Sequence, residues 1–439
     1  MNVLKFGGTS VGSAQRIKNV ADLISKRGRN IVVLSAMAGT TNSLVEISDY
    51  LRRGNIDGAK ETVNNLEKKY ARELSDLFSD AEWRQEAQKA VNESFSIIRS
   101  FTETPFATAE KTILAQGEKI STAMMYCYLR SMGVNVVLLD ALEFMRTDAN
   151  AEPEITYTRN RLRPMLQRHP DAELFLTQGY ICRNSNGGVD NLQRGGSDLT
   201  ASLIGAAIQA DVIEIWTDID GMHNNDPRYV EGTRPVEQLH FEEAAELAYF
   251  GAKILHPACV LPAKLNNIPV KLLNTMEPTA KGTTIDNNYV HNPQGIKAIA
   301  AKDNITAVRI KSGRMLLAYG FLHKVFETFE TFRTPIDMIA TSEVGVSVTV
   351  DDDRNLHTIV DELKKFATVT VDHDMVIICV VGDLDWHNCG LETKALKAME
   401  DIPVRMISYG GSDYNISFLI HKDDKIKALN SLSKHLFKE

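Results

Sequence analysis

Short apolar runs alternate with longer segments whose apolar positions recur at helical spacing through residues 1–280. The apolar runs end in small or polar residues, which is typical of buried strands. An alternation of strands and helices favours a mainly parallel α/β sheet with helices on both faces. The predicted strands are an opening strand from Val3 and residues 30–35, 134–139, 212–217 and 268–273, and residues 174–182 predict a further strand or strand pair.

The predicted helices of this region differ in their surface character. Residues 56–100 are rich in charge and periodic at helical spacing, so they predict two solvent-facing helices. A long helix is expected over about 107–132, another over 197–209, and an amphipathic one over 240–250. The sequence N-S-N-G-G at residues 184–188 predicts a hairpin turn.

The pattern changes after about Pro278. Residues 281–295 are rich in Gly, Thr and Asn, which indicates a connection at a domain boundary. The shorter elements beyond it form two βαββαβ units, of which the second lacks its last strand. The strand at 305–310 could supply it, and the second unit would then be discontinuous in sequence. Two small α+β repeats that follow a larger α/β domain suggest regulation more than chemistry.

The elements of these repeats follow from alternation and helical spacing. Residues 336–343 and 404–411 resemble each other in position and shape, which supports an internal repeat. The predicted strands are 305–310, 315–319, 336–341, 344–350, 368–371, 376–381, 404–408 and 415–420. The predicted helices are 322–332, 355–366, 390–399 and 425–436.

Composition limits the classes of protein to consider. A chain of 439 residues, 44% hydrophobic and 24% charged, is expected to form two or three globular domains. The net charge of -8 argues against general binding to nucleic acid or anionic membranes. No apolar run approaches the roughly 20 residues of a membrane span, and the N-terminus enters a strand directly, so a cytoplasmic location is expected. Five widely spaced cysteines without a C-x-x-C pair support neither a disulfide framework nor a structural zinc site.

The first candidate for chemistry is V-L-K-F-G-G-T-S-V-G at residues 3–12. It reads as a strand, a glycine turn and a helix start, a junction whose free amides and helix dipole suit phosphate. Lys5 adds a positive charge beside it. A tight turn with a solvated strand-end lysine is the structural alternative. Neither a Walker A loop nor a G-x-G-x-x-G fingerprint follows the strand.

The second candidate is Q-R-G-G-S-D at residues 193–198, which opens a helix. Ser197 is a favourable N-cap, and the two glycines would let a ligand approach the backbone. Arg194 offers a planar fork for a carboxylate or phosphate, and Asp198 could orient groups near a phosphoryl group. The alternative is a capped helix in which Asp198 serves only the helix dipole.

The third candidate is W-T-D-I-D-G-M-H-N-N-D-P-R at residues 216–228, where a buried strand ends. Sheets of this class bind ligands at such strand ends. Asp218 and Asp220 could instead form an Asx turn around Gly221, and the register excludes an EF-hand. Arg228 is either a nucleotide phosphate contact or a surface charge.

Two charged residues stand among apolar or small neighbours. Glu118 follows Gly117 in A-Q-G-E-K-I-S-T, so a ligand could approach closely and its carboxylate could face an amine, although exposure is the usual explanation. Lys253 in F-G-A-K-I-L-H-P could reach a nucleotide or extend outward to solvent.

Together these segments resemble the aspartate kinases of the amino-acid kinase superfamily. The matching motifs stand in family order: K-F-G-G-T-S-V, S-A-M-A-G-T-T-N from Ser35, G-E-K-I-S-T, R-G-G-S-D, T-D-I-D-G, D-P-R and G-A-K-I-L-H-P. In the second half, G-F-L-H-K-V-F from Gly320 and I-D-M-I-A-T-S-E-V from Ile336 resemble the effector-binding segment of the family's ACT domain pair, particularly in lysine-sensitive forms.

The resemblance implies an architecture. A three-layer αβα sandwich with a mainly parallel sheet would form the catalytic domain over 1–280, followed by a linker over 281–297. Two ferredoxin-like α+β ACT domains would form a regulatory region over 298–439. The first ACT domain would cover about 313–373, and the second about 374–439 together with a strand at 298–311.

The resemblance also implies residue roles. Lys5 would stabilise the γ-phosphoryl group in transfer and Asp198 would organise its site, with phosphate contacts from Gly7, Gly8, Thr9 and Ser10. L-Aspartate would be held by Glu118 on its amine, by Arg194 on a carboxylate, and by Ser35, Thr41 and Ser197. ATP would be bound by Thr217, Asp218, His223, Arg228, Lys253 and Ile254, although many relatives carry a tyrosine in place of His223. The effector would contact Phe321, Leu322, Ile336, Asp337, Ser342 and Glu343.

The implied activity is transfer of the γ-phosphoryl group of ATP to the side-chain carboxylate of L-aspartate, the first step toward lysine, threonine and methionine. Mg²⁺ would be held largely by phosphates and water, without a dedicated metal site. Feedback inhibition by lysine, or else threonine, and a homo-oligomer through the ACT domains are expected. The alternatives are a kinase for another carboxylate substrate and a catalytically silent amino-acid sensor.

Overall fold

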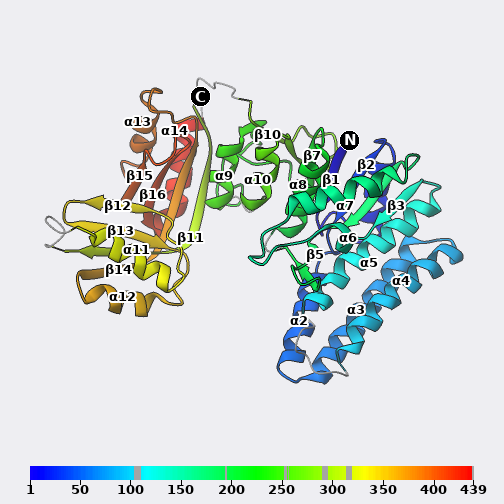
Figure 1. The fold of residues 1–439 in the computed structure, drawn as a ribbon. Helices are drawn as coiled ribbons and strands as arrows, with labels where there is room; N and C mark the ends of the chain where they lie inside the picture. The colour runs from blue at the N-terminus through cyan, green and yellow to red at the C-terminus, as the bar shows by residue number, and fades with distance from the viewer. Residues whose placement is uncertain are drawn as a thin grey trace. The chain divides into compact units, whose positions relative to one another are not determined.

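The computed structural model describes residues 1–102, 110–192, 195–251, 255, 257–288, 295–312 and 319–437. The chain separates into two compact units (Figure 1). The first comprises Met1–Gly221 with Leu255–Asn287, and the second comprises Met222–Ile254 with Asn288–Glu439.

The first unit is organised by a largely parallel sheet. Its strands follow the order β3-β4-β2-β1-β7-β9-β10, in which β10 alone runs antiparallel to its neighbour β9. The central strands are buried on both faces, which explains their continuous apolar sequence. Their bounds are β1 Asn2–Phe6, β2 Asn30–Leu34, β3 Val136–Leu139, β4 Leu174–Gln178, β7 Ile213–Thr217, β9 Val270–Asn274 and β10 Thr283–Asp286. The predicted parallel α/β fold is confirmed.

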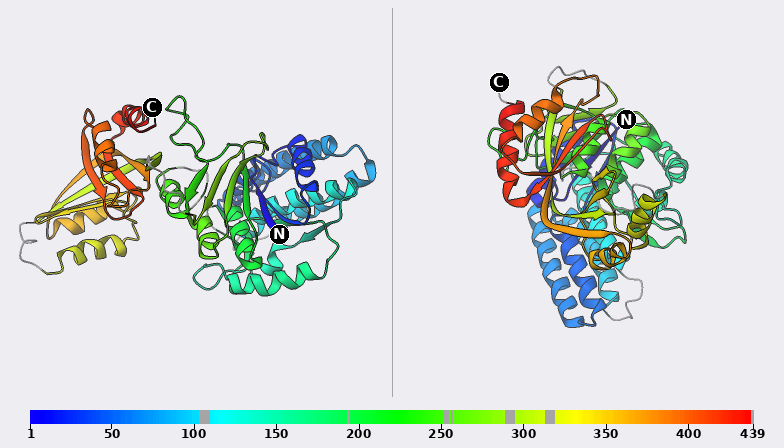
Figure 2. Two further views of the ribbon diagram at one scale, coloured as in Figure 1. Left: turned by 90° about the horizontal axis from the view of Figure 1, so that it is seen from above. Right: turned by 90° about the vertical axis from the view of Figure 1, so that its left-hand side faces the viewer.

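Several helices of the first unit bury one apolar stripe, whereas α5 and α8 are buried on most sides. Helix α1, for example, places Ile17, Val20 and Ile24 in the core at helical spacing, and the Ser13 side chain caps its first turn. The two charged helices expected over 56–100 are confirmed as α3 and α4, which lie side by side (Figures 1 and 2). The bounds are α1 Ala14–Ser25, α2 Thr40–Arg52, α3 Ile56–Leu77, α4 Ala81–Ser100, α5 Glu110–Ser131, α6 Ala141–Phe144, α7 Ile155–Gln167, α8 Gly196–Ile208 and α10 Pro257–Leu265.

In this unit, a predicted hairpin is present, and one helix was not predicted from the sequence. The predicted hairpin is present as β5 Ile181–Arg183 and β6 Val189–Asn191, and the Asn184 side chain accepts two amide hydrogen bonds in its turn. Helix α7 was not predicted, because it is rich in arginine and contains Pro164. Its buried stripe consists only of Thr158, Leu162 and Leu166.

The second unit is built on an antiparallel sheet of order β12-β13-β11-β14-β16-β15. One apolar core lies around α11 and α12, and a second around α13 and α14, so each repeat has its own core. The strands of this sheet are β11 Ile296–Lys311, β12 Ile339–Ser342, β13 Gly345–Val350, β14 Thr368–Gly382, β15 Val404–Tyr409 and β16 Asn415–His421, and the short strand β8 Gln238–His240 lies outside it. The helices are α9 Phe241–Tyr249, α11 Phe321–Thr331, α12 Leu356–Lys364, α13 Leu391–Ala398 and α14 Lys425–Phe437.

Two long strands, β11 and β14, serve both repeats, which changes the predicted strand assignment. Residues 305–311 of β11 lie between β13 and the first half of β14, so they form the first strand of the first repeat. Residues 296–302 pair with the second half of β14 and complete the second repeat. The assignment of 305–310 to the second repeat is therefore wrong, although that repeat is discontinuous as expected. The strand predicted at 315–319 lies almost wholly outside the described residues.

The division into units also differs from the expected boundary at residue 280. Strand β10 extends the first sheet through residues expected to form a linker, because it pairs with β9. Residues 222–251 pack with the second unit: Asn225 donates to the Leu429 carbonyl at 3.1 Å, and His240 stacks on Tyr414. Apolar periodicity predicts that a residue is buried, but it does not predict which element covers that residue. It therefore could not show with which unit these residues pack.

Candidate active site

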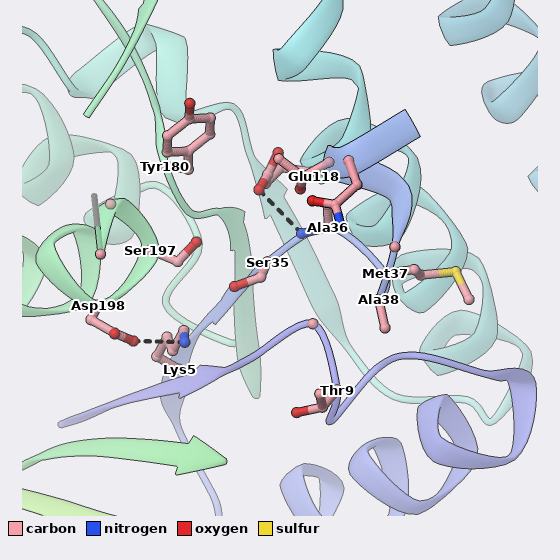
Figure 3. Close-up of a pocket in the computed structure, with 16 residues that line it drawn as sticks. Lys5, Thr9, Ser35, Ala36, Met37, Ala38, Glu118, Tyr180, Ser197 and Asp198 are labelled. Carbon is pink, nitrogen blue, oxygen red and sulfur yellow. Dashed lines mark hydrogen bonds and ion pairs between the residues drawn. The ribbon is translucent and has the colours of Figure 1, made fainter. Parts of the chain in front are cut away.

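A cavity of about 550 Å³ opens in the first unit (Figure 3). It lies where β1 and β2 end, at the carboxyl edge of the parallel strands, which is where sheets of this class place ligands. Its lining comes from four places in the sequence: Lys5, Gly8, Thr9; Ser35, Ala36, Met37, Ala38, Gly39, Thr41, Asn42; Glu118; and Tyr180, Gly195, Gly196, Ser197, Asp198.

An ion pair between Lys5 and Asp198 forms one wall. The Lys5 Nζ atom lies 2.6 Å from Asp198 Oδ1, and both side chains are nearly buried, with exposed fractions of 11% and 13%. Lys5 stands near the end of β1, whereas Asp198 lies in the first turn of α8. This arrangement holds a lysine ammonium group at the cavity while a carboxylate balances its charge.

The glycine turn after β1 brings the backbone close to the next active-site segment. A Cβ atom on Gly8 would lie 2.7 Å from the Ala36 carbonyl oxygen, so a side chain is excluded there. The Gly8 carbonyl accepts a hydrogen bond from the Ala38 amide at 3.1 Å. Gly8 and Thr9 line the cavity, whereas Gly7 does not. Ser10 is buried and bonds to Thr275 at 2.7 Å, so its hydroxyl is not directed at the cavity lining.

Residues 35–42 form the opposite wall. The loop after β2 is short, because α2 begins at Thr40 and places Thr41 in its first turn. Gly39 adopts a positive φ of 80° before the helix, a conformation that favours glycine. Ser121 of α5 donates to the Ser35 carbonyl at 2.8 Å and holds the start of the segment.

Glu118 is a buried carboxylate in this cavity. Its side chain accepts a hydrogen bond from the Ala36 amide at 3.2 Å, and the residue is only 4% exposed (Figure 3). Burial raises the pKa of Glu118 to about 7, against the opposing effect of that amide. The usual explanation of such a residue by exposure is therefore wrong here. A cationic group entering the cavity would find a carboxylate whose hydrogen-bond donor is the Ala36 amide and not a cationic side chain.

The N-terminus of α8 packs tightly against the end of β4. A Cβ atom on Gly196 would lie 2.5 Å from the Tyr180 ring, and one on Gly179 would lie 2.6 Å from the Ser197 hydroxyl. The helix is capped by Gly195, with φ of 77° and no side-chain bond, so the expectation that Ser197 is the N-cap is wrong. Ser197 lies in the first turn and lines the cavity. Arg194 lies outside the described residues.

Several cavity residues were not singled out from the sequence. Met37, Ala38, Gly39 and Asn42 belong to the motif that begins at Ser35, so the motif was the signal that could have identified them. Tyr180 had no such signal, because it follows a strand without any distinctive pattern. Its backbone has a positive φ of 67°, and burial, with Glu118 second, raises the pKa of its hydroxyl to about 12.

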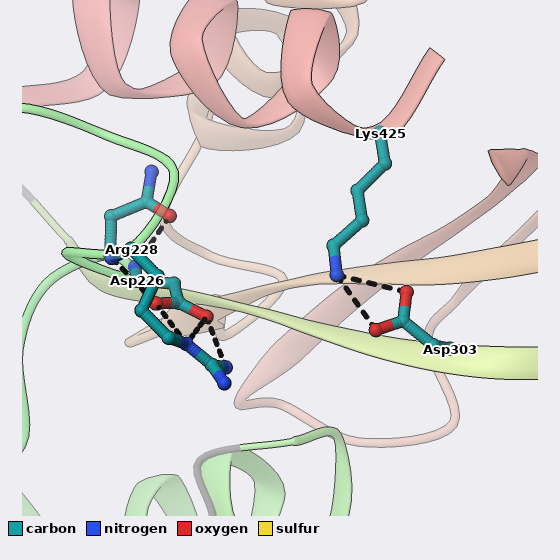
Figure 4. A network of polar contacts seen from close by, with 5 residues as sticks. Asp226, Arg228, Asp303 and Lys425 are labelled. Atoms are coloured by element: carbon teal, nitrogen blue, oxygen red, sulfur yellow. Dashed lines mark hydrogen bonds and ion pairs between the residues drawn. The ribbon is translucent and has the colours of Figure 1, made fainter. Parts of the chain in front are cut away.

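The residues expected to bind nucleotide are distributed over both units. Thr217 and Asp218 lie at the end of β7 in the first unit, and the Thr217 hydroxyl donates to the Asp218 carboxylate at 3.1 Å. In the second unit, Arg228 forms an ion pair with Asp226 at 2.6 Å (Figure 4). His223, also in that unit, bonds to Thr233 at 2.9 Å. Lys253 and Ile254 lie outside the described residues.

The residues expected to bind an effector lie on α11 and on the approach to β12 and β13. Phe321 is buried, Ile336 is half-buried, and Leu322, Ser342 and Glu343 are exposed. The Asp337 side chain is 1% exposed and binds Lys302 Nζ at 2.6 Å and the Tyr249 hydroxyl at 2.8 Å. Burial raises the pKa of Asp337 above its usual range. Its carboxylate is thus engaged by two side chains of the same unit.

Comparison with known proteins identifies two families. Residues 1–274 match the model of the amino acid kinase family, and residues 378–436 match an ACT domain. The chain is 32% identical to lysine-sensitive aspartokinase 3 of Escherichia coli, covering 99% of both chains. It is 34% identical to the chloroplastic aspartokinase 1 of Arabidopsis thaliana, covering 99% of this chain and 80% of that protein.

Solved structures agree with these matches. The chain is similar to E. coli aspartokinase III in complex with aspartate and ADP, with a TM-score of 0.85, 31% identity and complete coverage of both chains. Similarity to the same enzyme in complex with lysine and aspartate has a TM-score of 0.81 at 31% identity, again over both whole chains. Within the part of the chain that the structure describes, there is no helix with the length and apolar character needed to span a bilayer.

Proposed function

The chain belongs to the amino acid kinase family and, within it, to the aspartokinases, and from this premise we propose how its site works. It is an ATP-dependent kinase, and it transfers the γ-phosphoryl group of ATP to the side-chain carboxylate of L-aspartate. The products are 4-phospho-L-aspartate and ADP. The observation that supports this proposal most is one cavity lined by both the Lys5–Asp198 ion pair and the buried Glu118 carboxylate.

Lys5 acts on the group that moves. Phosphoryl transfer needs charge stabilisation and in-line positioning more than covalent catalysis. The Lys5 ammonium stabilises the negative charge on the phosphoryl oxygens, and Asp198 holds it at 2.6 Å in the required place. The amides around Gly8 and the start of α8 add hydrogen-bond donors that favour anions. The attacking aspartate carboxylate is already a nucleophile, so no strong general base is required.

Glu118 selects a substrate with a free amine. Its burial makes an unpaired negative charge costly, so an ammonium group that neutralises it gains from the pairing. Thr41, Ser35 and Ser197 line the same cavity and supply hydroxyl groups for the rest of the substrate. Arg194, by its place in the R-G-G-S-D motif, would hold a carboxylate. An N-acylated amino acid lacks the cation that Glu118 requires.

Mg²⁺ is the expected metal partner of ATP. Among the described residues, no group of three or more His, Cys, Asp or Glu side chains is arranged to hold a metal ion. We therefore expect the nucleotide phosphates and water to supply most of its ligands, with Asp198 as a nearby carboxylate. The ion would neutralise charge on the phosphates.

An acceptor panel tests the substrate. The full-length chain is incubated with Mg²⁺ and ATP, and ADP formation is measured with L-aspartate, L-glutamate, N-acetyl-L-glutamate or N-acetyl-L-aspartate. We expect turnover with L-aspartate and little with the acylated compounds. Turnover with another acceptor but not with L-aspartate would refute the substrate assignment, and the absence of any ATP-dependent turnover would favour a silent sensor.

We also propose that lysine, or else threonine, inhibits the enzyme through the ACT repeats. The support is the match of residues 378–436 to an ACT domain and the similarity to a relative named lysine-sensitive. Titration of each amino acid against the rate measures this effect. Insensitivity to both would contradict the regulatory proposal while leaving the catalytic one intact.

A homo-oligomer formed through the second unit is proposed on its exposed apolar residues. Ile339 on β12 and Ile407 and Tyr409 on β15 are 42–44% exposed, although most strand residues of this kind are buried. Pairing of two copies would cover such residues. Sedimentation velocity measures the state, and a monomer at all concentrations assayed for activity would contradict this proposal.

A further inference from the structure

Three side chains of helix α3 form hydrogen bonds with the segment that ends in the start of α2, part of the cavity wall, and with the start of α1. Lys69 Nζ donates to the Ala38 carbonyl at 2.6 Å, and the Tyr70 hydroxyl pairs with the Thr40 hydroxyl at 2.7 Å. The Ala14 amide donates to the Glu73 carboxylate at 2.6 Å. Lys69, Tyr70 and Glu73, called the α3 cluster below, lie within one turn of the helix, and Glu73 follows the other two at spacings of four and three residues.

Each of these hydrogen bonds gives a partner to a polar group at or just before the first residue of a helix, either α1 or α2. Ala38 precedes the Gly39 cap of α2, which has no side-chain hydrogen bond of its own. Ala14 is the first residue of α1, and its amide is among the first four that have no partner within a helix. A carboxylate at that position is also favoured by the helix dipole. The α3 cluster therefore supports the starts of both helices that follow the active-site turns.

The middle contact is fully buried. Tyr70 and Thr40 are both 0% exposed, and burial raises the pKa of the Tyr70 hydroxyl well above its usual range, so it remains neutral. Removal of either hydroxyl would leave the other without its partner in a site that excludes water. Thr40 is adjacent to Thr41, which lines the cavity. The pair therefore fixes the backbone beside a proposed substrate contact.

The other side of the same segment is held by α5. A Cβ atom on Gly117 would lie 2.9 Å from the Ala36 side chain and 3.4 Å from that of Thr40. Residues 36–40 are therefore packed against α5 while Lys69 and Tyr70 bond to them from α3. Movement of α3 would change the position of the cavity wall, because α5 leaves little space behind it.

We infer that the α3 cluster is a set of positioning residues for phosphoryl transfer, an inference that rests on the proposed function. Lys69 and Tyr70 place the 35–41 wall against the amino-acid substrate. Glu73 places the start of α1, and with it the glycine turn that faces the phosphate. No residue of the cluster lines the cavity, so each acts through the segment that it holds. Small misplacements of reacting groups reduce reaction rates strongly. Loss of one of these contacts should therefore lower the efficiency of phosphoryl transfer.

The central test compares two lysines of the same bonding type. Lys69→Met removes the bond from α3 to the Ala38 carbonyl. Lys18→Met removes a bond at 2.7 Å from α1 to the Asp76 carbonyl of α3, and neither of these two residues lines the cavity. Both variants are made in the full-length chain, and steady-state kinetics are measured with ATP and L-aspartate. We expect KM for L-aspartate to rise on the order of tenfold in Lys69→Met and to remain unchanged in Lys18→Met. Lys69→Arg, which retains a donor, should restore most of the affinity.

Two further variants separate positioning from stability. Tyr70→Phe should raise KM for L-aspartate, whereas Glu73→Gln should raise KM for ATP, because the two residues hold different segments. Thermal unfolding is measured for each variant, with kinetics recorded well below the transition. If Lys69→Met does not fold, Tyr70→Phe and Glu73→Gln decide the question.

The inference would be overturned by variants that lose thermal stability while both KM values and kcat stay within about twofold of the parent chain. A twofold change corresponds to less free energy than one hydrogen bond contributes. Failure of the proposed function is a distinct result, because it appears in the unmodified chain as absence of turnover with L-aspartate. In that case the same comparison is made with the acceptor that the chain does use.

Discussion

Replacement of Glu118 by glutamine offers a sharp test, because it removes the charge and keeps the shape. The pKa of this group is raised by burial from 4.5, the ordinary value, to about 7. Each tenfold change in an ionisation equilibrium corresponds to about 1.4 kcal/mol. The carboxylate therefore costs the folded chain about 3 kcal/mol at a pH above 7, as an order of magnitude.

The sign follows from proton binding. Between pH 4.5 and about 7 the folded chain binds the proton of Glu118 and the unfolded chain does not. The contribution of this group to stability therefore decreases as the pH rises through that interval. Glu118→Gln has no such loss, and its amide oxygen can still accept the bond from Ala36. We expect the variant to be more stable than the parent chain at pH 8 and about equally stable at pH 4.5.

The assay combines unfolding and kinetics. Urea unfolding at pH 5, 6, 7 and 8 measures the stability difference between the parent chain and Glu118→Gln. In the parent chain, kcat/KM for L-aspartate should fall as the pH is lowered below about 7, since the free enzyme then loses the carboxylate that binds the amine. In the variant, kcat/KM should be low at every pH, with no inflection near 7. Equal pH dependence of stability in the two chains, or a variant less stable at pH 8, would refute the assigned burial of charge.

Other substitutions address single contacts. Lys5→Ala should lower kcat by on the order of 10³-fold, because the ammonium group that stabilises the transferred group is lost. Lys26→Ala, at the exposed C-cap of α1, is the control and should leave kcat unchanged. Equal values of kcat in the two variants would show that the Lys5 ammonium does not stabilise the transferred group. Gly8→Ala should raise KM for ATP at least about tenfold, because its Cβ atom would lie 2.7 Å from the Ala36 carbonyl oxygen. Steady-state kinetics measure this effect, and Gly411→Ala is the control, because no atom lies within 4 Å of the added Cβ atom there. Tyr249→Phe removes the hydroxyl bound to Asp337. The concentration of lysine that halves the rate should shift at least about threefold, while kcat is unchanged. An unaltered inhibition curve would show that this hydrogen bond has no part in regulation.

Local sequence was sufficient for much of the first unit. Strands buried on both faces are mainly apolar, so β2, β4 and β7 could be predicted without any knowledge of their neighbours. Glycine turns that precede helices also carry a local signal, because close backbone approach excludes a side chain, as at Gly8. The motifs built on those turns directed attention to the strand ends where the cavity lies.

Contacts between distant residues depended on the tertiary structure. Lys5 and Asp198 are far apart in sequence and meet only because β1 is central and α8 begins beside it. Likewise, periodicity showed two regulatory repeats but not that β11 and β14 each run through both, since one long strand and two short ones have the same alternation. The burial of Asp337 by Tyr249 and Lys302 was invisible for the same reason.

The sequence by itself determined the strand and helix order, the glycine turns and the kind of chemistry that the motifs allow, because these depend on neighbours within a few residues. Only the tertiary structure decided which charges pair, that Glu118 is buried, and that α3 bonds to Ala38 and to the start of α1. Those properties depend on the distance and the solvent around each group, and both are set by packing between elements that the sequence separates.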